Sequence, residues 1–417
     1  MMDRDQAPDI TVIGAGIIGI SCAVQLQARG LRVAVIDKLA PGDTTSHGNA
    51  GVFAVCGCIP VATPGFLWTV PRLLLDPLGP LSLPLNYLPK LAGWGTKFAL
   101  NTRMERFRHI SSALNPLLEN ATELHLQQAQ MAGAEQWAKA SPYYYLYKDQ
   151  AAYEADKLAW DTRRSFGIEY EMLQGEALHS REEAISDQFN LAVALKHHGF
   201  SPNPGQLVKA LAEHFVRQGG ELITGEVVKF AISDGRPDSV ITDRGIYPLN
   251  KVVIAGGAWS ARLAEQLGHK VPLESERGYH VELSDPGVEL KAPIMFSAGK
   301  LVATPMEGGI RLAGLVEFGG LKADPDYDFC DRLLHHARTL FPGINTRQAI
   351  KWMGHRPSVS DSLPVIGQCP RHDNVYYAFG HQHMGLSMAP RTGHIIADLV
   401  SRGDCELDLS PYRIDRF

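Results

Sequence analysis

The feature that most constrains the fold of this chain is a glycine-rich turn near its start, GAGIIG at residues 14–19. The short apolar run Ile10–Ile13 precedes the turn, and apolar residues at helical spacing follow it until Gly30. A second apolar run, Leu31–Ile36, then ends on Asp37. Strand, turn, helix and strand within about 30 residues predict one complete βαβ unit.

Each glycine of this turn has a physical role in holding a dinucleotide. Gly14 permits a tight turn, Gly16 lets the backbone approach a pyrophosphate, and Gly19 lets the helix pack closely on the strand. The N–H groups at the start of the helix favour phosphate. Asp37 would accept hydrogen bonds from the ribose hydroxyls and would disfavour a 2′-phosphate. The alternative is a glycine-rich turn beside a surface aspartate, which the complete strand-turn-helix-strand context disfavours.

The turn alone does not distinguish NAD from FAD. A second apolar strand with glycines, VVIAGGAWS at residues 252–260, appears much later in the chain, and a third glycine-rich turn lies at residues 380–385. Glycine is abundant overall, with 40 in 417 residues against a usual share of about 7%. Three separated places where backbone can approach a ligand suit an elongated molecule that is buried along its length, which favours FAD.

Composition and charge limit the class of protein. A length of 417 residues predicts two or three domains, and 45% hydrophobic residues are typical of a packed globular chain. The net charge of −5 lacks the basic excess of a nucleic-acid binder. The first ten residues carry acidic side chains where a secretory signal would carry basic ones, so we expect a cytosolic protein. The six cysteines form no CxxC pair, and we expect buried free thiols and no metal site.

One apolar region leaves two interpretations open. Residues 52–70 are uncharged over the length of a membrane-spanning helix, but Pro60 and Pro64 interrupt them, so we expect no span. Residues 66–100 remain rich in Leu, Pro and Trp. They predict either an apolar lid or core segment, or a patch that lies on a membrane surface.

Six segments together resemble the D-amino-acid oxidase superfamily of flavoproteins, and most closely its bacterial D-amino-acid dehydrogenase branch. They are GAGIIG (14–19), TSHGNAG (45–51), VVIAGGAWS (252–260), RGY (277–279), GHRPSVSDSLPVIG (354–367) and GHQHMGLSMAPRTG (380–393). They follow the order of the family and span nearly the whole chain. The resemblance implies FAD as the cofactor and an α/β fold, α+β overall. In that fold a Rossmann-like FAD-binding domain is interleaved with a substrate domain built on an antiparallel sheet.

The implied FAD-binding domain comprises residues 1–85, 196–262 and 350–417, and the implied substrate-binding domain comprises residues 86–195 and 263–349. The resemblance also implies which residues contact FAD. In the first part of the chain these are Gly14, Ala15, Gly16, Ile17, Ile18, Gly19, Asp37, Lys38, Thr45, Ser46, Gly48, Asn49, Ala50 and Gly51. Later in the chain they are Val227 at the adenine, Gly256, Gly257, Trp259, Gly354, His381, Met384, Gly385, Leu386 and Ser387. His47 lies where some distant flavoproteins attach FAD covalently, and a plain polar loop contact is the alternative.

The family oxidises the Cα–N bond of an amino acid. A hydride passes from Cα to flavin N5, and the resulting imine is hydrolysed to a 2-oxo acid and ammonia or, for a cyclic substrate, remains a cyclic imine. The protein must then clamp the substrate carboxylate, for which the planar fork of arginine is well suited. The resemblance implies Arg356 as this clamp, and the alternative is a structural ion pair with Asp361. The start of the last helix, residues 385–387, would stabilise the anionic reduced flavin.

Three further residues are candidates for the substrate site. Arg277 and Tyr279 lie where the substrate domain resumes, although Arg277 could equally form a surface ion pair with Glu274 or Glu276. Some oxidase relatives carry an arginine at the position of His383. We therefore expect His383 either to line the substrate pocket with a weaker charge or to be a structural histidine.

Three functions remain open from the sequence. The first is an FAD-dependent D-amino-acid dehydrogenase, for which His383 suggests cyclic substrates such as D-proline or hydroxy-D-proline. The second is a glycine- or sarcosine-type oxidase that uses oxygen, and the third is a non-catalytic FAD-binding subunit of a larger electron-transfer complex. The expected partners are an amino-acid substrate and an electron acceptor, namely a quinone, a carrier protein or oxygen. Peripheral contact with the inner face of a membrane is also expected.

Overall fold

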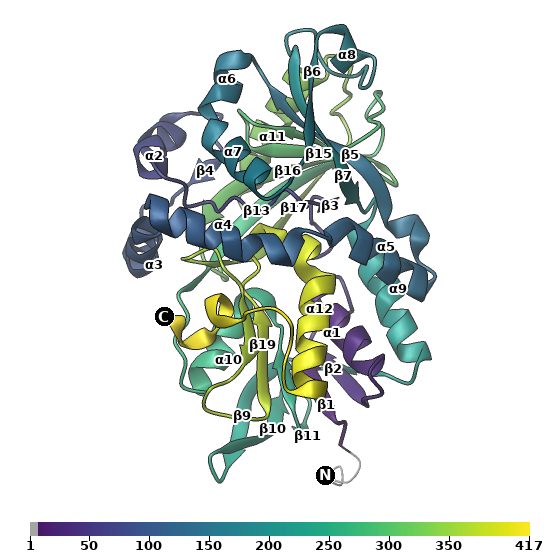
Figure 1. The fold of residues 1–417 in the computed structure, drawn as a ribbon, viewed down its shortest axis with the longest axis vertical. Coiled ribbons are helices and arrows are strands. Elements are labelled where there is room, and N and C mark those ends of the chain that lie inside the picture. Colours follow the sequence, from purple (N-terminus) through teal and green to yellow (C-terminus); the bar gives the residue numbers. More distant parts are fainter. Residues whose placement is uncertain (1–6) are drawn as a thin grey trace.

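The structure, a computed structural model, describes residues 7–417 as two stacked halves that are each built on their own sheet (Figure 1). The lower half in Figure 1 contains a six-stranded sheet in the order β18-β19-β12-β1-β2-β8. Its strands are β1 (Ile10–Ile13), β2 (Val33–Asp37), β8 (Glu221–Thr224), β12 (Val252–Ile254), β18 (Val365–Gln368) and β19 (Val375–Phe379). All neighbouring strands are parallel except β18 and β19. The predicted βαβ unit is therefore confirmed.

Both faces of this sheet are covered, as its almost fully apolar strands require. The helices α1 (Ile17–Gln27), α9 (Pro204–Arg217) and α12 (Gly385–Arg402) pack on one face. The other face carries α10 (Ser260–Gln266) and a three-stranded antiparallel sheet of β9 (Val227–Ser233), β10 (Arg236–Thr242) and β11 (Ile246–Pro248). Successive residues of β1 alternate between these two cores, with Val12 in the first and Ile13 in the second.

The upper half is built on a ten-stranded, mainly antiparallel sheet. Its main path runs β17-β13-β16-β15-β14-β5-β7-β3, with β4 beside β16 and β6 beside β7. The strands are β3 (Val52–Phe53), β4 (Leu81–Ser82), β5 (Lys139–Tyr147), β6 (Tyr170–Gln174), β7 (Leu191–Phe200), β13 (Leu273–Leu283), β14 (Ile294–Phe296), β15 (Leu301–Met306), β16 (Gly309–Phe318) and β17 (Ala349–Val359).

The remaining helices surround the upper sheet and the join between the halves. They are α2 (Phe66–Leu75), α3 (Leu88–Leu100), α4 (Met104–Leu118), α5 (Ala121–Ala132), α6 (Gln150–Ala155), α7 (Lys157–Ser165), α8 (Glu176–His179) and α11 (Asp331–Leu340). Short 3₁₀ turns are η2 (Glu135–Trp137), η3 (Gly257–Trp259), η4 (Tyr327–Cys330), η5 (Gln382–Met384), η6 (Ser410–Tyr412) and η7 (Ile414–Arg416). The long helix α4 crosses the join between the two halves in Figure 1.

The chain passes repeatedly between the halves, so the predicted interleaving and fold class are confirmed. Strand pairing nevertheless places β3 and β17 in the ten-stranded sheet, whereas the expected FAD-binding segments 1–85 and 350–417 include nearly all of their residues. The hydrogen bonds of a sheet join strands that are far apart in sequence, and composition along the chain does not reveal such partners. The segment boundaries remain a proposal.

Two smaller expectations concern the cysteines and the membrane. All six cysteines are free thiols, five of them buried, while Cys405 is half-buried. Across residues 7–417, no helix has the length and apolarity that crossing a bilayer would need. Prolines interrupt the uncharged stretch 52–70, which forms β3, a loop and the first half of α2.

Candidate active site

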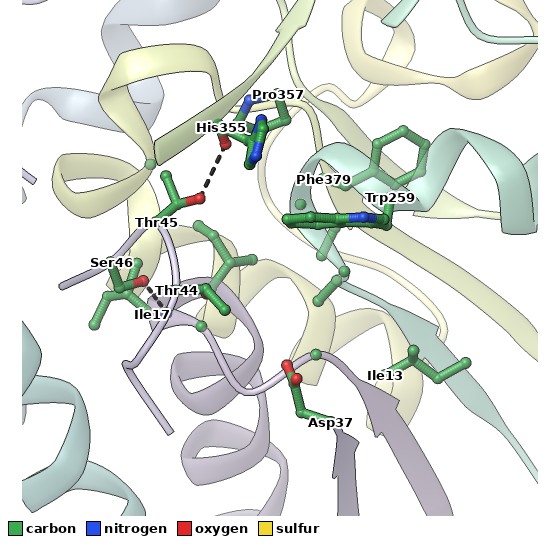
Figure 2. Close-up of a pocket in the computed structure, with 18 of the residues that line it drawn as sticks. Ile13, Ile17, Asp37, Thr44, Thr45, Ser46, Trp259, His355, Pro357 and Phe379 are labelled. Carbon is green, nitrogen blue, oxygen red and sulfur yellow. Dashed lines mark hydrogen bonds between the residues drawn. The ribbon is translucent and has the colours of Figure 1, made fainter. Parts of the chain in front are cut away.

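A cleft opens at the carboxyl ends of the parallel strands β1, β2 and β12 (Figure 2). It contains about 1270 Å³ of empty space, part of which is open to solvent. The chain leaves β1 towards β2 and returns through β12 on the other side of β1, so the cleft lies where the strand order reverses. Open α/β sheets bind their ligands at this place.

Most of the residues predicted to contact a dinucleotide line this cleft. They are Gly14, Gly16, Ile17, Ile18, Asp37, Lys38, Thr45, Ser46, Asn49, Val227, Gly256, Gly257, Trp259, His381, Gly385 and Leu386. Another eight predicted residues lie outside its lining: Ala15, Gly19, Gly48, Ala50, Gly51, Gly354, Met384 and Ser387. The structure thus brings together three glycine-rich turns that are far apart in sequence. The contacts of individual residues with a cofactor remain a prediction.

The glycines of the first turn are required by the closeness of neighbouring backbone. Gly14 has a φ of +114°, and a Cβ atom there would lie 2.5 Å from the carbonyl oxygen of Ala255 after β12. A Cβ atom on Gly19 would lie 1.8 Å from the carbonyl oxygen of Gly14. A side chain at either position would force strands or helix apart, so the turn keeps bare backbone at the floor of the cleft.

Polar groups at the end of β2 and in the following loop tie this turn to its surroundings. The Asp37 carboxylate accepts a hydrogen bond from the N–H of Ala15 at 2.7 Å, and Figure 2 shows its side chain pointing into the cleft. The Ser46 hydroxyl accepts from the N–H of Ile17 at 3.0 Å, and the Thr45 hydroxyl donates to the carbonyl of His355 at 3.0 Å (Figure 2). The loop after β2 is therefore anchored to both halves.

A second helix start faces the cleft from the opposite side. Gly385 and Leu386 begin α12, an 18-residue helix whose first turn carries no acidic residue and no side-chain cap. Its first N–H groups thus keep the positive partial charge of a helix N-terminus. Just before it, the His381 Nε2 lies 3.1 Å from the Thr392 hydroxyl, and burial lowers the pKa of His381 to about 3. This histidine is neutral at physiological pH.

These features fit a dinucleotide on grounds of chemistry. The cleft offers a carboxylate for ribose hydroxyls, bare glycine backbone for a pyrophosphate, and helix starts for negative charge. Its lining includes residues from β9, such as Val227, and from α12, such as Leu386, which suits a ligand that contacts several separate elements. Among residues 7–417, no group of three or more His, Cys, Asp or Glu side chains could hold a metal ion.

The predicted carboxylate clamp lies on the upper sheet, where β13 and β17 pair. Arg356 stands opposite Glu276 in this ladder, and its Nη1 donates to Glu276 Oε1 at 3.2 Å. Nη1 and Nη2 also donate to the carbonyls of Leu315 and Gly314, at 2.9 and 3.1 Å. Asp361, the partner considered from the sequence, instead pairs with Arg416 at 2.8 Å. That alternative for Arg356 was therefore wrong.

The backbone around Arg356 is shaped to receive its guanidinium. A Cβ atom on Gly278 would lie 2.3 Å from Arg356 Cζ, so the guanidinium lies directly over a glycine of β13. Leu315 is held in the left-handed region at φ +58°, next to the carbonyls that Arg356 binds. A buried leucine in this conformation stores strain, which is typical of functional sites. The Nε–H of Arg356 bonds to no residue that the structure describes.

His383 lies near this arginine. Its side chain keeps an exposed surface, whereas its neighbours His381, Gln382 and Met384 are buried. Burial by the surrounding protein lowers the pKa of His383, Glu276 opposes this shift and Arg356 adds to it. His383 thus combines an accessible surface with the electrostatic influence of Glu276 and Arg356. The structure thus brings together Arg356 and His383, two of the four residues predicted for the substrate site.

Arg277 and Tyr279 point to the other face of β13. Arg277 is fully buried, lies 3.3 Å from Glu317 and donates to the carbonyl of Asp324 at 2.7 Å. Tyr279 is also buried, and its hydroxyl donates to Glu317 as well. A surface ion pair of Arg277 with Glu274 or Glu276 is therefore wrong, because side chains alternate along a strand and Glu276 faces Arg356. In this conformation neither Arg277 nor Tyr279 is accessible to a substrate.

Several residues of the site were not predicted from the sequence. Glu276 was considered only as a surface partner of Arg277, although it is buried and binds Arg356. His355, Pro357 and Phe379 line the cleft beside the predicted residues (Figure 2). The motif GHRP, which includes His355 and Pro357, was a signal for these two residues. No local signal marked Glu276, which becomes part of the site only through strand pairing.

A dinucleotide cleft of this kind, joined to an antiparallel substrate sheet, defines a two-domain flavoprotein oxidoreductase. The family described as FAD dependent oxidoreductase matches residues 9–399, and the chain belongs to this family. The predicted resemblance and the predicted FAD cofactor are confirmed, and the protein is an enzyme.

Individual relatives and solved structures are similar over nearly their whole length. The chain is 34% identical to a D-amino-acid oxidase of Bradyrhizobium diazoefficiens over 98% of both chains. It is 27% identical to a D-amino acid dehydrogenase of Rhizobium rhizogenes, over 98% of this chain and 99% of that one. Among solved structures, glycine oxidase from Geobacillus kaustophilus has a TM-score of 0.74 at 21% identity, over 99% of both chains. That last similarity shows the fold alone.

Proposed function

We propose that this enzyme oxidises the Cα–N bond of a D-amino acid and yields an imine or, after hydrolysis, a 2-oxo acid. The relatives at 34% and 27% identity, named D-amino-acid oxidase and D-amino acid dehydrogenase, support this substrate class. Both names describe oxidation of the same compounds. An oxidase and a dehydrogenase differ in the electron acceptor, and the shared fold does not distinguish the two.

The observation that carries the proposal is the open edge of Arg356. Three acceptors, Glu276 and the carbonyls of Gly314 and Leu315, hold the two terminal nitrogens. The Nε–H and one Nη2–H stay free of bonds to the described residues, and the side chain keeps 19% of its surface exposed. These two N–H groups form the side edge of the guanidinium fork, which can bind a carboxylate bidentately.

The surrounding residues define what the chain itself contributes to the reaction. FAD, when bound, supplies the two-electron oxidation. Arg356 would hold the substrate carboxylate in a fixed orientation, and Glu276 would keep the guanidinium from rotating. His383 is neutral at physiological pH because burial lowers its pKa. It would therefore contact the amine or side chain of the substrate without adding a second positive charge. The start of α12 would favour negative charge on the cofactor.

Anaerobic mixing of the holoenzyme with single amino acids tests this proposal. We expect D-amino acids to bleach the flavin absorption band, with small and cyclic ones such as D-proline and hydroxy-D-proline included in the panel. L-enantiomers at the same concentration serve as the matched control. If no D-amino acid bleaches the flavin, the proposal fails, and a non-catalytic FAD-binding subunit becomes the better interpretation.

An oxidase that transfers electrons to oxygen is a second candidate, favoured by the relative named D-amino-acid oxidase and by the likeness to glycine oxidase. Stopped-flow reoxidation of the reduced enzyme separates the two. Rapid reoxidation by air with release of peroxide would identify an oxidase, whereas slow reoxidation by air and fast reoxidation by a quinone or dye would identify a dehydrogenase. Glycine and sarcosine belong in this panel.

We also propose a peripheral contact with an anionic lipid surface through α2 and the segment that leads into α3. No residue of α2 is buried, and Trp68, Leu75 and Leu85 are 90%, 83% and 83% exposed. Residues 66–108 also carry six Lys or Arg against two Asp or Glu, in a chain of net charge −5. Exposed apolar side chains beside an excess of basic ones suit a surface of acidic phospholipid.

Co-sedimentation with vesicles tests the lipid contact. We expect binding to vesicles that contain phosphatidylglycerol, weaker binding to pure phosphatidylcholine, and loss of binding in high salt. The triple variant Trp68→Ser, Leu75→Ser and Leu85→Ser should lose binding while keeping turnover with a soluble dye. Failure of the native enzyme to bind acidic vesicles at low salt would contradict the contact.

A further inference from the structure

The loop between β2 and β3, residues 44–51, is held from behind by a buried arginine of the upper sheet. The Nη1 of Arg311 on β16 donates to the carbonyl of His47 at 2.8 Å and to that of Asn49 at 2.7 Å. Its Nη2 donates to Glu282 at 3.1 Å. The Arg311 side chain is only 3% exposed. One buried cation thus binds two carbonyls of a loop that belongs to the cofactor cleft.

Neighbouring side chains of the same sheet bind the carbonyls in between. The Nδ1 of His280 lies 3.0 Å from the carbonyl oxygen of Gly48, and the hydroxyl of Thr304 donates to the carbonyl of Ala50 at 2.7 Å. Burial lowers the pKa of His280 to about 3, so the ring is neutral and its Nδ1–H donates. Four consecutive carbonyls, from residue 47 to residue 50, therefore point towards the upper sheet.

Unlike these carbonyls, several N–H groups of the loop have no hydrogen-bond partner among the described residues. The amides of Thr45, Ser46, Gly48 and Ala50 bond to no residue that the structure describes. Three other loop amides bond within the loop: His47 to the carbonyl of Thr44, Asn49 to the carbonyl of Ser46, and Gly51 to the side-chain oxygen of Asn49. Thr45 and Ser46 line the cleft, so the loop offers their unpaired amides to a ligand there, while the upper sheet binds the carbonyls of residues 47–50. Such a set of backbone N–H groups favours an anion.

We propose that Arg311 is a positioning residue for FAD: it fixes the carbonyls of residues 47–50 against the upper sheet, so that the loop amides face the cofactor. This inference rests on FAD as the cofactor and does not depend on which amino acid is oxidised. Glu282 offsets part of the Arg311 charge, but the guanidinium remains the cation nearest to these carbonyls. Arginine is suited to the role because one terminal nitrogen can donate to two carbonyls while the other holds the carboxylate.

Titration of the apoprotein with FAD tests the proposal, because it requires no substrate. We expect Arg311→Met to weaken FAD binding about 10- to 100-fold, since charge-assisted hydrogen bonds that order the loop are lost. Arg311→Lys keeps the charge and should recover part of the affinity. The matched control is Arg29→Met, which removes a partly buried arginine that binds Asp398 and the carbonyl of Gln25, far from the cleft. It should leave FAD affinity unchanged.

A second measurement separates positioning from simple stabilisation. At saturating FAD, Arg311→Met should shift the flavin midpoint potential to a more negative value and alter the flavin spectrum, because the loop donors are displaced. A purely structural arginine would lower the melting temperature of apoprotein and holoprotein equally and leave both properties unchanged.

If Arg311→Met does not fold, two milder variants still test the proposal. Thr304→Val removes only the bond to Ala50 and should weaken FAD binding about 3- to 10-fold. If Arg311→Lys and Thr304→Val both bind FAD within twofold of the native affinity, with an unchanged potential, Arg311 does not position the loop. Normal FAD binding without amino-acid oxidation would instead contradict only the proposed function.

Discussion

The cofactor cleft and the proposed substrate site differ in the groups that form them. The cleft is formed largely by backbone, with glycines at its floor and unpaired amides at its walls. The proposed substrate site is formed by charged and polar side chains, Arg356, Glu276 and His383, on strands and turns that are far apart in sequence. Backbone recognises what all members of a flavoprotein family share, and side chains can change from one substrate to another.

This difference separates the expected effects of substitutions. A change in the cleft should act first on FAD affinity, because a new Cβ atom takes the space that backbone and cofactor need. A change in the proposed substrate site should act first on turnover and leave FAD affinity nearly unchanged.

The largest effect is expected for Gly14→Ala. The new Cβ atom would lie 2.5 Å from the carbonyl oxygen of Ala255, and the φ of +114° disfavours any L-residue. FAD affinity should fall at least about 1000-fold, or more than 4 kcal/mol, because β1 and β12 must separate. Fluorescence titration with FAD measures this loss. Gly95→Ala in α3, where a Cβ atom meets nothing within 4 Å, is the control. Native-like FAD binding by Gly14→Ala would contradict a cleft built on bare backbone.

The cleft could be predicted from the sequence because its determinants are local. The turn at residues 14–19 carries its glycines, its strand and its helix within one βαβ unit, and Asp37 ends that unit. Each of these residues has a role that short-range spacing reveals. The residues of the proposed substrate site could be predicted only in part. The family resemblance predicted Arg356 and His383, which the structure brings near each other, but it did not predict their shared neighbour Glu276.

Glu276 could not be predicted because its place depends on register. It lies 80 residues from Arg356 and meets it only because β13 and β17 pair in one particular alignment. A shift of one residue would turn Glu276 to the opposite face of the sheet and bring Arg277 to the face that carries Arg356. Sequence patterns along β13 do not fix this register. The same ambiguity explains why Arg277, which the structure buries beside Glu317, was considered for the substrate site.

The second-largest effect, a loss of turnover, is expected for Arg356→Leu in the proposed substrate site. Loss of a bidentate carboxylate clamp should lower kcat/KM for amino acids about 100- to 1000-fold, or about 3–4 kcal/mol, while FAD affinity changes less than threefold. Steady-state kinetics and FAD titration of one preparation measure both. Removal of the arginine also leaves Glu276 buried without its partner, which costs about 3–5 kcal/mol of stability.

The double variant Arg356→Leu with Glu276→Gln is the control for that instability. It should regain thermal stability without regaining turnover. If it regains turnover as well, Arg356 acts through stability and does not clamp the substrate. Arg356→Lys should fall between the native enzyme and Arg356→Leu, because a lysine cannot present the planar fork.

A smaller effect, on the pH dependence of stability, is expected for His381, the histidine of the cleft. His381 of the cleft is buried, and its pKa falls to about 3, against about 6.5 in an unfolded chain. Its contribution to stability is therefore complete above pH 6.5 and is lost as the pH falls, because the unfolded chain then binds the proton more readily. The slope is at most about 1.4 kcal/mol per pH unit. In urea unfolding between pH 7 and pH 5, the free energy of unfolding should decline less for His381→Gln than for the native enzyme. If both decline equally, His381 is not a cause of the acid sensitivity.

The smallest effect is expected for His383, which should influence turnover more than stability. Burial lowers its pKa, the negative Glu276 raises it and the positive Arg356 lowers it, so the ring is neutral at pH 7 and gains a proton only on acidification. A protonated ring beside Arg356 would bind the carboxylate more strongly and the substrate ammonium less well. We therefore expect kcat/KM to decline by a few-fold on acidification, at a lower pH than an ordinary histidine would give, and His383→Gln to remove this acidic decline. Replacement of Glu276 by Gln should move the decline to lower pH, because the group that favours the protonated ring is lost.

If neither variant alters the pH profile, His383 belongs to the structural framework and not to the proposed substrate site. That site would then be defined by Arg356 alone.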